Sequence, residues 1–126
     1  MNEFHGPRNI YIVRHCRPQG RNGFHTCIGR KDIPLSLTGI EQANQLMDYF
    51  LNLNLNRIYS SPLKRAKNTA EIIADEIGFN KKDIIVENCL TEVNFGIFEN
   101  LTWQEIVEQY ADESESWIEF KHKYKF

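Results

Sequence analysis

The chain has 126 residues, of which 41% are hydrophobic and 25% are charged, a composition typical of a single soluble globular domain. A formal net charge of −2 argues against nucleic acid or an anionic membrane as a partner, and no apolar run has the length of a membrane span. The three cysteines show no CxxC spacing, so the sequence predicts neither a disulfide framework nor a zinc site, and we expect a cytoplasmic protein.

The first predicted element is a short apolar strand over Asn9 to Val13, which ends abruptly in Arg14 and His15. Residues 14–36 follow without any periodicity and are rich in glycine, proline and arginine. A loop of this length is unusual in a compact domain, and such loops often line binding sites.

Two helix–strand units are predicted next. Thr38 and Glu41 have the spacing of a capping box that opens an amphipathic helix, and residues 57–60 form a second short strand. Ser61 and Pro62 then give an N-cap followed by proline at the first position of another helix, which Gly78 ends. The predicted buried stripe of this second helix consists of Ala66, Ala70, Ile73 and Ile77.

The rest of the chain adds a third strand over residues 84–87 and two short helices. Capping-box patterns starting at Thr102 and Ser116 mark the beginnings of these helices. Strands that alternate with helices predict an α/β fold with a mostly parallel sheet flanked by helices. Functional sites in such sheets form at the carboxyl ends of the strands.

Polar side chains of complementary type follow each of the three predicted strands. Arg14 and His15 follow the first strand, Arg65 lies near the start of the helix after the second, and Glu92 follows the third. Guanidinium groups match phosphate oxygens in a bidentate way. A neutral imidazole can attack phosphorus, and a carboxyl group can protonate the departing oxygen. These residue types together predict phosphoryl transfer on a small phosphorylated substrate.

Other candidate site residues remain open at this point. Arg21 and Arg30, in the long loop, either contact the substrate beyond its phosphate or are simply solvated. Cys16 beside Arg14 is a weaker candidate nucleophile, because His15 already occupies the end of the strand. Each residue read alone has an ordinary structural explanation, and only the combination points to a phosphate site.

Three segments, "VRHC…GRKDIPLSLTGIEQA", "IYSSPLKRAKNTAEII" and "LTEVNFGIFENLTWQEI", resemble the histidine phosphatase superfamily, which includes the cofactor-dependent phosphoglycerate mutases. The resemblance implies a phosphoglycerate mutase-like fold and activity without a metal or other cofactor. It implies that His15 becomes phosphorylated, that Arg14 and Arg65 hold the phosphate, and that Glu92 is the proton donor. The last segment looks more like the phosphatase branch, with α-ribazole phosphatase as the nearest guess, than like the mutase branch.

The sequence also departs from this family pattern. Cys16 and Asn100 replace glycines, and Arg17-Pro18 replaces a Glu-Thr pair. By the same resemblance, residues 1–126 correspond to the N-terminal portion of one domain, and a strand carrying a second histidine is missing. We therefore expect either a fragment or a chain that fills the gap by forming a homodimer. Three functions stay open: a phosphomonoesterase, a catalytically impaired remnant that binds phosphate, and a phosphoglycerate mutase.

Overall fold

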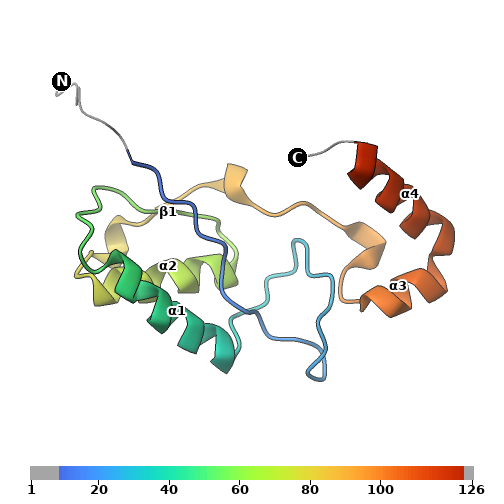
Figure 1. Cartoon of the computed structure of the whole chain (residues 1–126), viewed down its shortest axis with the longest axis horizontal. Helices are drawn as coiled ribbons and strands as arrows, with labels where there is room; N and C mark the ends of the chain where they lie inside the picture. Colours follow the sequence, from blue (N-terminus) through green and yellow to red (C-terminus); the bar gives the residue numbers. More distant parts are fainter. Residues whose placement is uncertain (1–8, 124–126) are drawn as a thin grey trace.

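The computed structural model describes residues 9–123, with side chains described as far as residue 119 (Figure 1). The elements, in chain order, are α1 (Leu37–Phe50), β1 (Tyr59–Ser60), α2 (Lys64–Glu76), β2 (Ile85–Val86), α3 (Trp103–Gln109) and α4 (Ala111–Lys123). Three short 3₁₀ turns complete the order: η1 (Lys81–Asp83), η2 (Asn88–Leu90) and η3 (Gly96–Phe98). Helices and strands alternate as the sequence predicts.

The two strands form a parallel pair in which Tyr59 lies opposite Ile85 and Ser60 lies opposite Val86. Helix α1 packs against α2, and α2 also contacts β1. Helices α3 and α4 pack on each other and lie on the far side of the long loop over residues 14–36 (Figure 1). The α/β class and the parallel pairing are confirmed, although the sheet has two strands within the described residues.

The predicted strand over Asn9 to Val13 is wrong for this chain. The segment runs as an elongated stretch beside the helices, but its backbone pairs with no described residue (Figure 1). The ring of Tyr11 packs edge-on against Tyr49 and Phe50 of α1, with ring centroids 6.3 and 5.9 Å apart. A strand needs a neighbouring backbone for its hydrogen bonds, and no described part of the chain supplies one here.

Helix α1 begins one residue before the predicted capping box. Its N-cap is Ser36, whose hydroxyl accepts a hydrogen bond from the Gly39 amide at 3.0 Å and donates one to the Arg17 carbonyl at 3.0 Å. Ser36 therefore fixes the helix start and attaches it to the long loop, while Thr38 lies within the first turn.

Helix α2 begins at Lys64, later than the Ser61-Pro62 signal predicts. The carboxylate of Asp32, from the long loop, accepts a hydrogen bond from the Lys64 amide at 2.6 Å. Asp32 thus caps the helix in place of Ser61, which the sequence predicts as the N-cap. The buried positions of α2 are Arg65, Thr69, Ile73 and Ala74. Of the predicted stripe, Ile73 is confirmed as buried, whereas Ala66, Ala70 and Ile77 are only half-buried. Ala66 and Ala70 instead line an open groove. Gly78 follows the helix with φ of +72°, which confirms the predicted end.

The C-terminal helices are attached to the segment that follows Glu92 through aromatic contacts. Phe98 packs against Tyr110, and Phe95 meets Trp117 edge-on with ring centroids 5.5 Å apart. The capping box of Thr102 is confirmed at the start of α3. The predicted one at Ser116 is wrong, since Ser116 lies inside α4. No helix of the described chain is both long enough and apolar enough to cross a membrane.

Candidate active site

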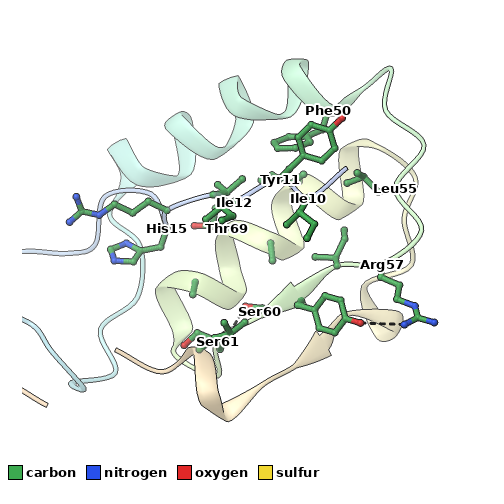
Figure 2. Close-up of a pocket in the computed structure, with 18 of the residues that line it drawn as sticks. Ile10, Tyr11, Ile12, His15, Phe50, Leu55, Arg57, Ser60, Ser61 and Thr69 are labelled. Atoms are coloured by element: carbon green, nitrogen blue, oxygen red, sulfur yellow. Dashed lines mark hydrogen bonds between the residues drawn. The ribbon is translucent and has the colours of Figure 1, made fainter. Parts of the chain in front are cut away.

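A large open groove lies between the segment of residues 9–15 and strand β1, with helix α2 along it (Figure 2). Its volume is about 1640 Å³. Four of the predicted site residues, from three separate segments, line this one groove: Arg14, His15, Arg65 and Glu92. The structure therefore brings together the side chains that the sequence selected as a phosphate site.

The two hydrogen bonds of His15 determine which ring nitrogen carries the proton. Nδ1 lies 2.8 Å from the backbone carbonyl of Cys16, which can only accept. Nε2 lies 3.3 Å from the Nε–H group of Arg65, which can only donate. His15 is therefore protonated on Nδ1 and presents a lone pair on Nε2 when it is neutral. A lone pair on an oriented imidazole nitrogen is what a nucleophile needs.

The surroundings of His15 also favour the neutral form of its ring. Partial burial lowers the pKa of His15 below 6.5, and the positive charges of Arg65 and Arg14 lower it further. The hydrogen bond to Cys16 and the charge of Glu92 act in the opposite direction but do not outweigh these effects. The ring is thus kept unprotonated, and able to attack, at neutral pH.

Arg65 is the most completely buried charged side chain of the site, with 2% of its surface exposed. Its two terminal nitrogens donate to the backbone carbonyls of Gly29 at 2.7 Å and Lys31 at 2.9 Å. Its Nε–H group faces His15. Three of the five guanidinium hydrogens have partners in this arrangement, so two remain for a phosphate oxygen. The long loop thereby fixes the direction of the Arg65 guanidinium.

Glu99 is a positioning residue that the sequence did not single out. One oxygen of its carboxylate accepts from the Arg30 amide at 2.9 Å and from the Phe95 amide at 3.2 Å. The same oxygen lies against Gly29, where an added Cβ atom would collide with it. Glu99 thus ties the turn that holds Arg65 to the segment that carries Glu92. Its position after "NFGIF" gave no signal of the contact with the loop, because the Arg30 amide is distant in sequence.

Thr69 is the second residue that the sequence missed, and it anchors the other side of the site. Its hydroxyl accepts from the Cys16 amide at 3.1 Å and donates to the Arg65 carbonyl at 2.8 Å. Because Thr69 is buried on α2, it holds the residue after His15 against the helix that carries Arg65. Thr69 lies four residues after Arg65, so the two residues are neighbours on one face of α2. This spacing is a sequence signal that could have pointed to Thr69.

Cys16 occupies the position where the family pattern has glycine, and the structure shows how the side chain is accommodated. The thiol is buried in a small apolar cluster with Leu35 and Ala43. Burial raises the pKa of the Cys16 thiol, which disfavours the thiolate that a nucleophilic cysteine needs. Asn100, the other replaced glycine, adopts φ of +69°, the left-handed conformation expected for it.

Glu92 and Arg14 are the exposed members of the site. One carboxylate oxygen of Glu92 accepts from the Val93 amide at 2.8 Å, and its charge acts on both His15 and Arg65. Arg14 forms no hydrogen bond or ion pair with any described residue, so its guanidinium is free to meet an anion in the groove.

The two loop arginines differ in their surroundings. Arg30 donates from Nε to the Glu92 carbonyl at 3.0 Å, which places it next to the proposed proton donor. One terminal nitrogen of Arg21 donates to both carboxylate oxygens of Glu105 at the start of α3, in an ion pair. This pair, together with the capping hydrogen bonds from Thr102, lowers the pKa of Glu105 to about 2. Arg30 therefore remains a candidate for substrate contact, whereas Arg21 attaches the loop to α3.

The described part of the chain has one histidine in the groove and no cluster of metal-ligating side chains. His15 is the one histidine among the described residues that line the groove, and His25 lies beside a separate small pocket. His5 lies outside the described residues, as does the side chain of His122. Within the described part, no three His, Cys, Asp or Glu side chains gather as a metal site would require.

Comparison with known proteins places these residues in a family. The family model for the histidine phosphatase superfamily (branch 1) matches residues 10–126. The chain belongs to the histidine phosphatase superfamily. A curated relative from Escherichia coli O1:K1, named probable phosphoglycerate mutase GpmB, is 35% identical over 108 residues, covering 86% of this chain and 46% of the relative. This histidine phosphatase chain thus spans about half the length of the curated relatives it matches.

Solved structures agree on the fold. The α-ribazole phosphatase from Shigella flexneri superimposes with a TM-score of 0.72 at 24% identity, covering 85% of this chain and 51% of the other. A mycobacterial glucosyl-3-phosphoglycerate phosphatase in complex with VO₃ superimposes with a TM-score of 0.70 at 25% identity, covering 82% of this chain and 49% of the other. A phosphoserine phosphatase variant from Entamoeba histolytica, bound to phosphoserine, superimposes with a TM-score of 0.60 at 30% identity, covering 73% of this chain and 43% of the other. The phosphoglycerate mutase-like fold predicted for this chain is confirmed, and the matched region covers about half of each solved structure.

Proposed function

We propose that this chain carries the phosphate-binding and nucleophilic half of a phosphomonoesterase that works through a phosphohistidine. The observation that carries the proposal is the pair of hydrogen bonds that leave a lone pair on His15 Nε2 directly beside the Arg65 guanidinium. Membership of the superfamily and the exposed charges of Arg14 and Glu92 in the same groove support it.

In the first step, the phosphate group of the substrate enters the groove and is held by Arg14 and the free hydrogens of Arg65. Nε2 of His15 attacks phosphorus, so that a P–N bond forms while the P–O bond to the alcohol breaks. Glu92, in its protonated form, gives its proton to the departing alcohol oxygen. The arginines offset the charge that builds up on the equatorial oxygens of the phosphoryl group.

In the second step, the phosphohistidine is hydrolysed. The Glu92 carboxylate takes a proton from a water molecule, whose oxygen attacks phosphorus as the P–N bond breaks. Inorganic phosphate leaves, His15 regains its lone pair on Nε2, and Glu92 is protonated again. Throughout, the Cys16 carbonyl keeps the proton on Nδ1 and offsets part of the positive charge of the phosphorylated ring.

The substrate class that we propose is a small phosphate monoester of an alcohol. The names of the structural neighbours describe enzymes for α-ribazole 5′-phosphate, glucosyl-3-phosphoglycerate and phosphoserine, which share that group and little else. A phosphoglycerate mutase is the second candidate, because the curated relatives carry that name. A mutase returns the phosphoryl group to the substrate, whereas a phosphatase passes it to water.

The experiment follows phosphorus by ³¹P NMR in a mixture of the chain with either an aryl phosphate or 3-phosphoglycerate, with no metal added. Release of inorganic phosphate that disappears in His15→Ala would support the phosphatase. Isomerisation of phosphoglycerate without release would support the mutase instead. Saturable binding of inorganic phosphate without turnover, lost in Arg65→Ala, would leave a phosphate-binding remnant. His25→Ala is the matched control, since His25 lies outside the groove.

A further inference from the structure

Arg30 lies in the long loop, next to the segment that carries Glu92. Its Nε–H group donates a hydrogen bond to the Glu92 carbonyl at 3.0 Å, and its backbone amide donates one to the Glu99 carboxylate at 2.9 Å. Both the backbone and the guanidinium of Arg30 are therefore fixed in place. Its two terminal nitrogens form no hydrogen bond or ion pair with any described residue. Four of the five guanidinium hydrogens are thus available to a ligand.

The carboxylates around Arg30 do not pair with its charge. Glu99, Asp32 and Glu92 each accept hydrogen bonds from backbone amides. Among the described residues, none of these three carboxylates forms an ion pair with the Arg30 guanidinium. The next residue, Lys31, is also exposed and adds charge of the same sign. The rim of the site beside Glu92 is therefore positively charged and open to an anionic group.

The phosphate group of the substrate does not need Arg30. A phosphate monoester carries roughly 1.5 to 2 negative charges at neutral pH, and Arg14 and Arg65 already supply two positive charges inside the groove. Glu92 is among the residues that line the groove, whereas Arg30 is not. Arg30 therefore lies at the rim, outside the phosphate site and on the side of Glu92.

The role of Glu92 determines which part of the substrate meets this rim. A residue that gives its proton to the departing alcohol oxygen must lie within hydrogen-bonding distance of that oxygen. The alcohol part of the substrate therefore lies against the Glu92 segment, and the Arg30 guanidinium is hydrogen-bonded to the backbone of that same residue. A group on the alcohol part, and not the phosphate, is what Arg30 can contact.

We propose that Arg30 is a specificity-determining residue, which selects phosphate monoesters whose alcohol part carries a second negatively charged group close to the ester oxygen. This inference rests on the proposed function, because it uses Glu92 as the proton donor. A guanidinium offers two parallel N–H groups that match the oxygens of such an anionic group. Its contact with Arg30 also holds the alcohol oxygen beside Glu92. An ester of an uncharged alcohol leaves Arg30 solvated and gains nothing from it.

The test compares two esters of equal length: phosphoglycolate, which carries a carboxylate, and ethyl phosphate, which does not. Calorimetric titration measures the Kd of each in the full chain carrying His15→Ala, which cannot consume them. Phosphoglycolate should bind about fivefold more tightly, as one exposed charge pair allows. Arg30→Gln should remove this preference and leave the affinities for ethyl phosphate and inorganic phosphate unchanged. Arg30→Lys keeps the charge and should retain part of the preference.

Arg57→Gln is the matched control, because Arg57 is exposed and lines the groove, and its described hydrogen bond goes to Tyr59. A preference that persists in Arg30→Gln, or that Arg57→Gln removes equally, would overturn the inference. Equal affinity for the two esters would overturn it as well, while release of phosphate by the wild type still upheld the proposed function. A binding preference without turnover would support the inference and count against the phosphatase. Failure to bind inorganic phosphate would overturn both.

Discussion

The Nε–H group of Arg65 donates a hydrogen bond to Nε2 of His15 across 3.3 Å, so the group that would bind phosphate rests on the atom that would attack it. The arginine is itself held in place by the carbonyls of Gly29 and Lys31. An incoming phosphoryl group would bind the two free hydrogens of Arg65 and displace the contact with His15, while the contacts with the two carbonyls would stay. The site is therefore organised before any ligand binds, which reduces the cost of ordering it.

Arg65→Lys should weaken both the fold and phosphate binding. Lysine keeps the positive charge but cannot reach two carbonyls and a ring nitrogen in one plane. We expect the free energy of unfolding to fall by about 1–3 kcal/mol, because at least one buried carbonyl loses its partner. Phosphate affinity should fall by about tenfold or more. Urea denaturation and calorimetric titration with inorganic phosphate measure the two effects.

Arg57→Lys is the matched control, since Arg57 is exposed and its hydrogen bond to the Tyr59 hydroxyl is long, at 3.4 Å. Its unfolding free energy should change by no more than about 0.5 kcal/mol. Equal effects of the two substitutions would contradict the role assigned to the Arg65 fork.

Thr69→Val should disturb His15 without touching it. The substitution keeps the shape of the side chain but leaves the buried Cys16 amide without its acceptor, which costs about 1–3 kcal/mol of stability. The Cys16 carbonyl, which accepts the hydrogen bond from His15 Nδ1, should shift together with the Cys16 amide. Thr69→Ser retains the hydroxyl and should restore most of the loss. The His15 ring resonances in ¹H–¹⁵N NMR report the tautomer, and an unchanged spectrum in Thr69→Val would disprove the anchoring role.

Gly29→Ala should be more damaging than Gly78→Ala, although both glycines have positive φ angles of +54° and +72°. A Cβ atom at Gly78 has no neighbour within 4 Å, so that variant should lose about 1–2 kcal/mol from the backbone angle alone. At Gly29 the added atom also displaces the Glu99 carboxylate, and the loss should be larger by about 1 kcal/mol or more.

Phosphate binding separates the two glycine variants further. Gly29→Ala should weaken it, because the Gly29 carbonyl aims Arg65. Gly78→Ala should leave it unaffected, since Gly78 lies at the far end of α2. If both variants lost the same stability and bound phosphate alike, Glu99 would have no positioning role.

His15 should make stability depend on pH in a defined direction. Its pKa is lowered in the folded chain, so the unfolded chain takes up a proton more readily as the pH falls below 6.5. The free energy of unfolding should therefore decrease as the pH falls from 6.5 to the folded-state pKa, and be unaffected by this group above 6.5. Urea denaturation on both sides of pH 6.5 measures the slope. His15→Asn, which does not titrate, should remove the contribution of His15 to this slope. An unchanged slope would contradict a lowered pKa of His15 in the folded chain.

The sequence alone determined which side chains could share one site. Arg14, His15, Arg65 and Glu92 follow the ends of predicted strands, and because such ends meet at one edge of a parallel sheet, these four side chains are expected to share one site. The candidate site and the alternation of helices and strands from α1 onward were predictable because they depend on residue type and on local periodicity.

The tertiary structure alone decided how the site is held and what remains open. Glu99 accepts from the distant Arg30 amide, and Asp32 caps a helix that begins far along the chain from it, so neither leaves a local pattern. The contact of Thr69 with the Cys16 amide is equally distant in sequence. The segment of residues 9–13 has the composition of a strand but lacks a neighbour, because a strand is defined by the backbone that pairs with it. Local sequence can specify which side chains a strand carries, but only the assembled chain shows whether a partner is present.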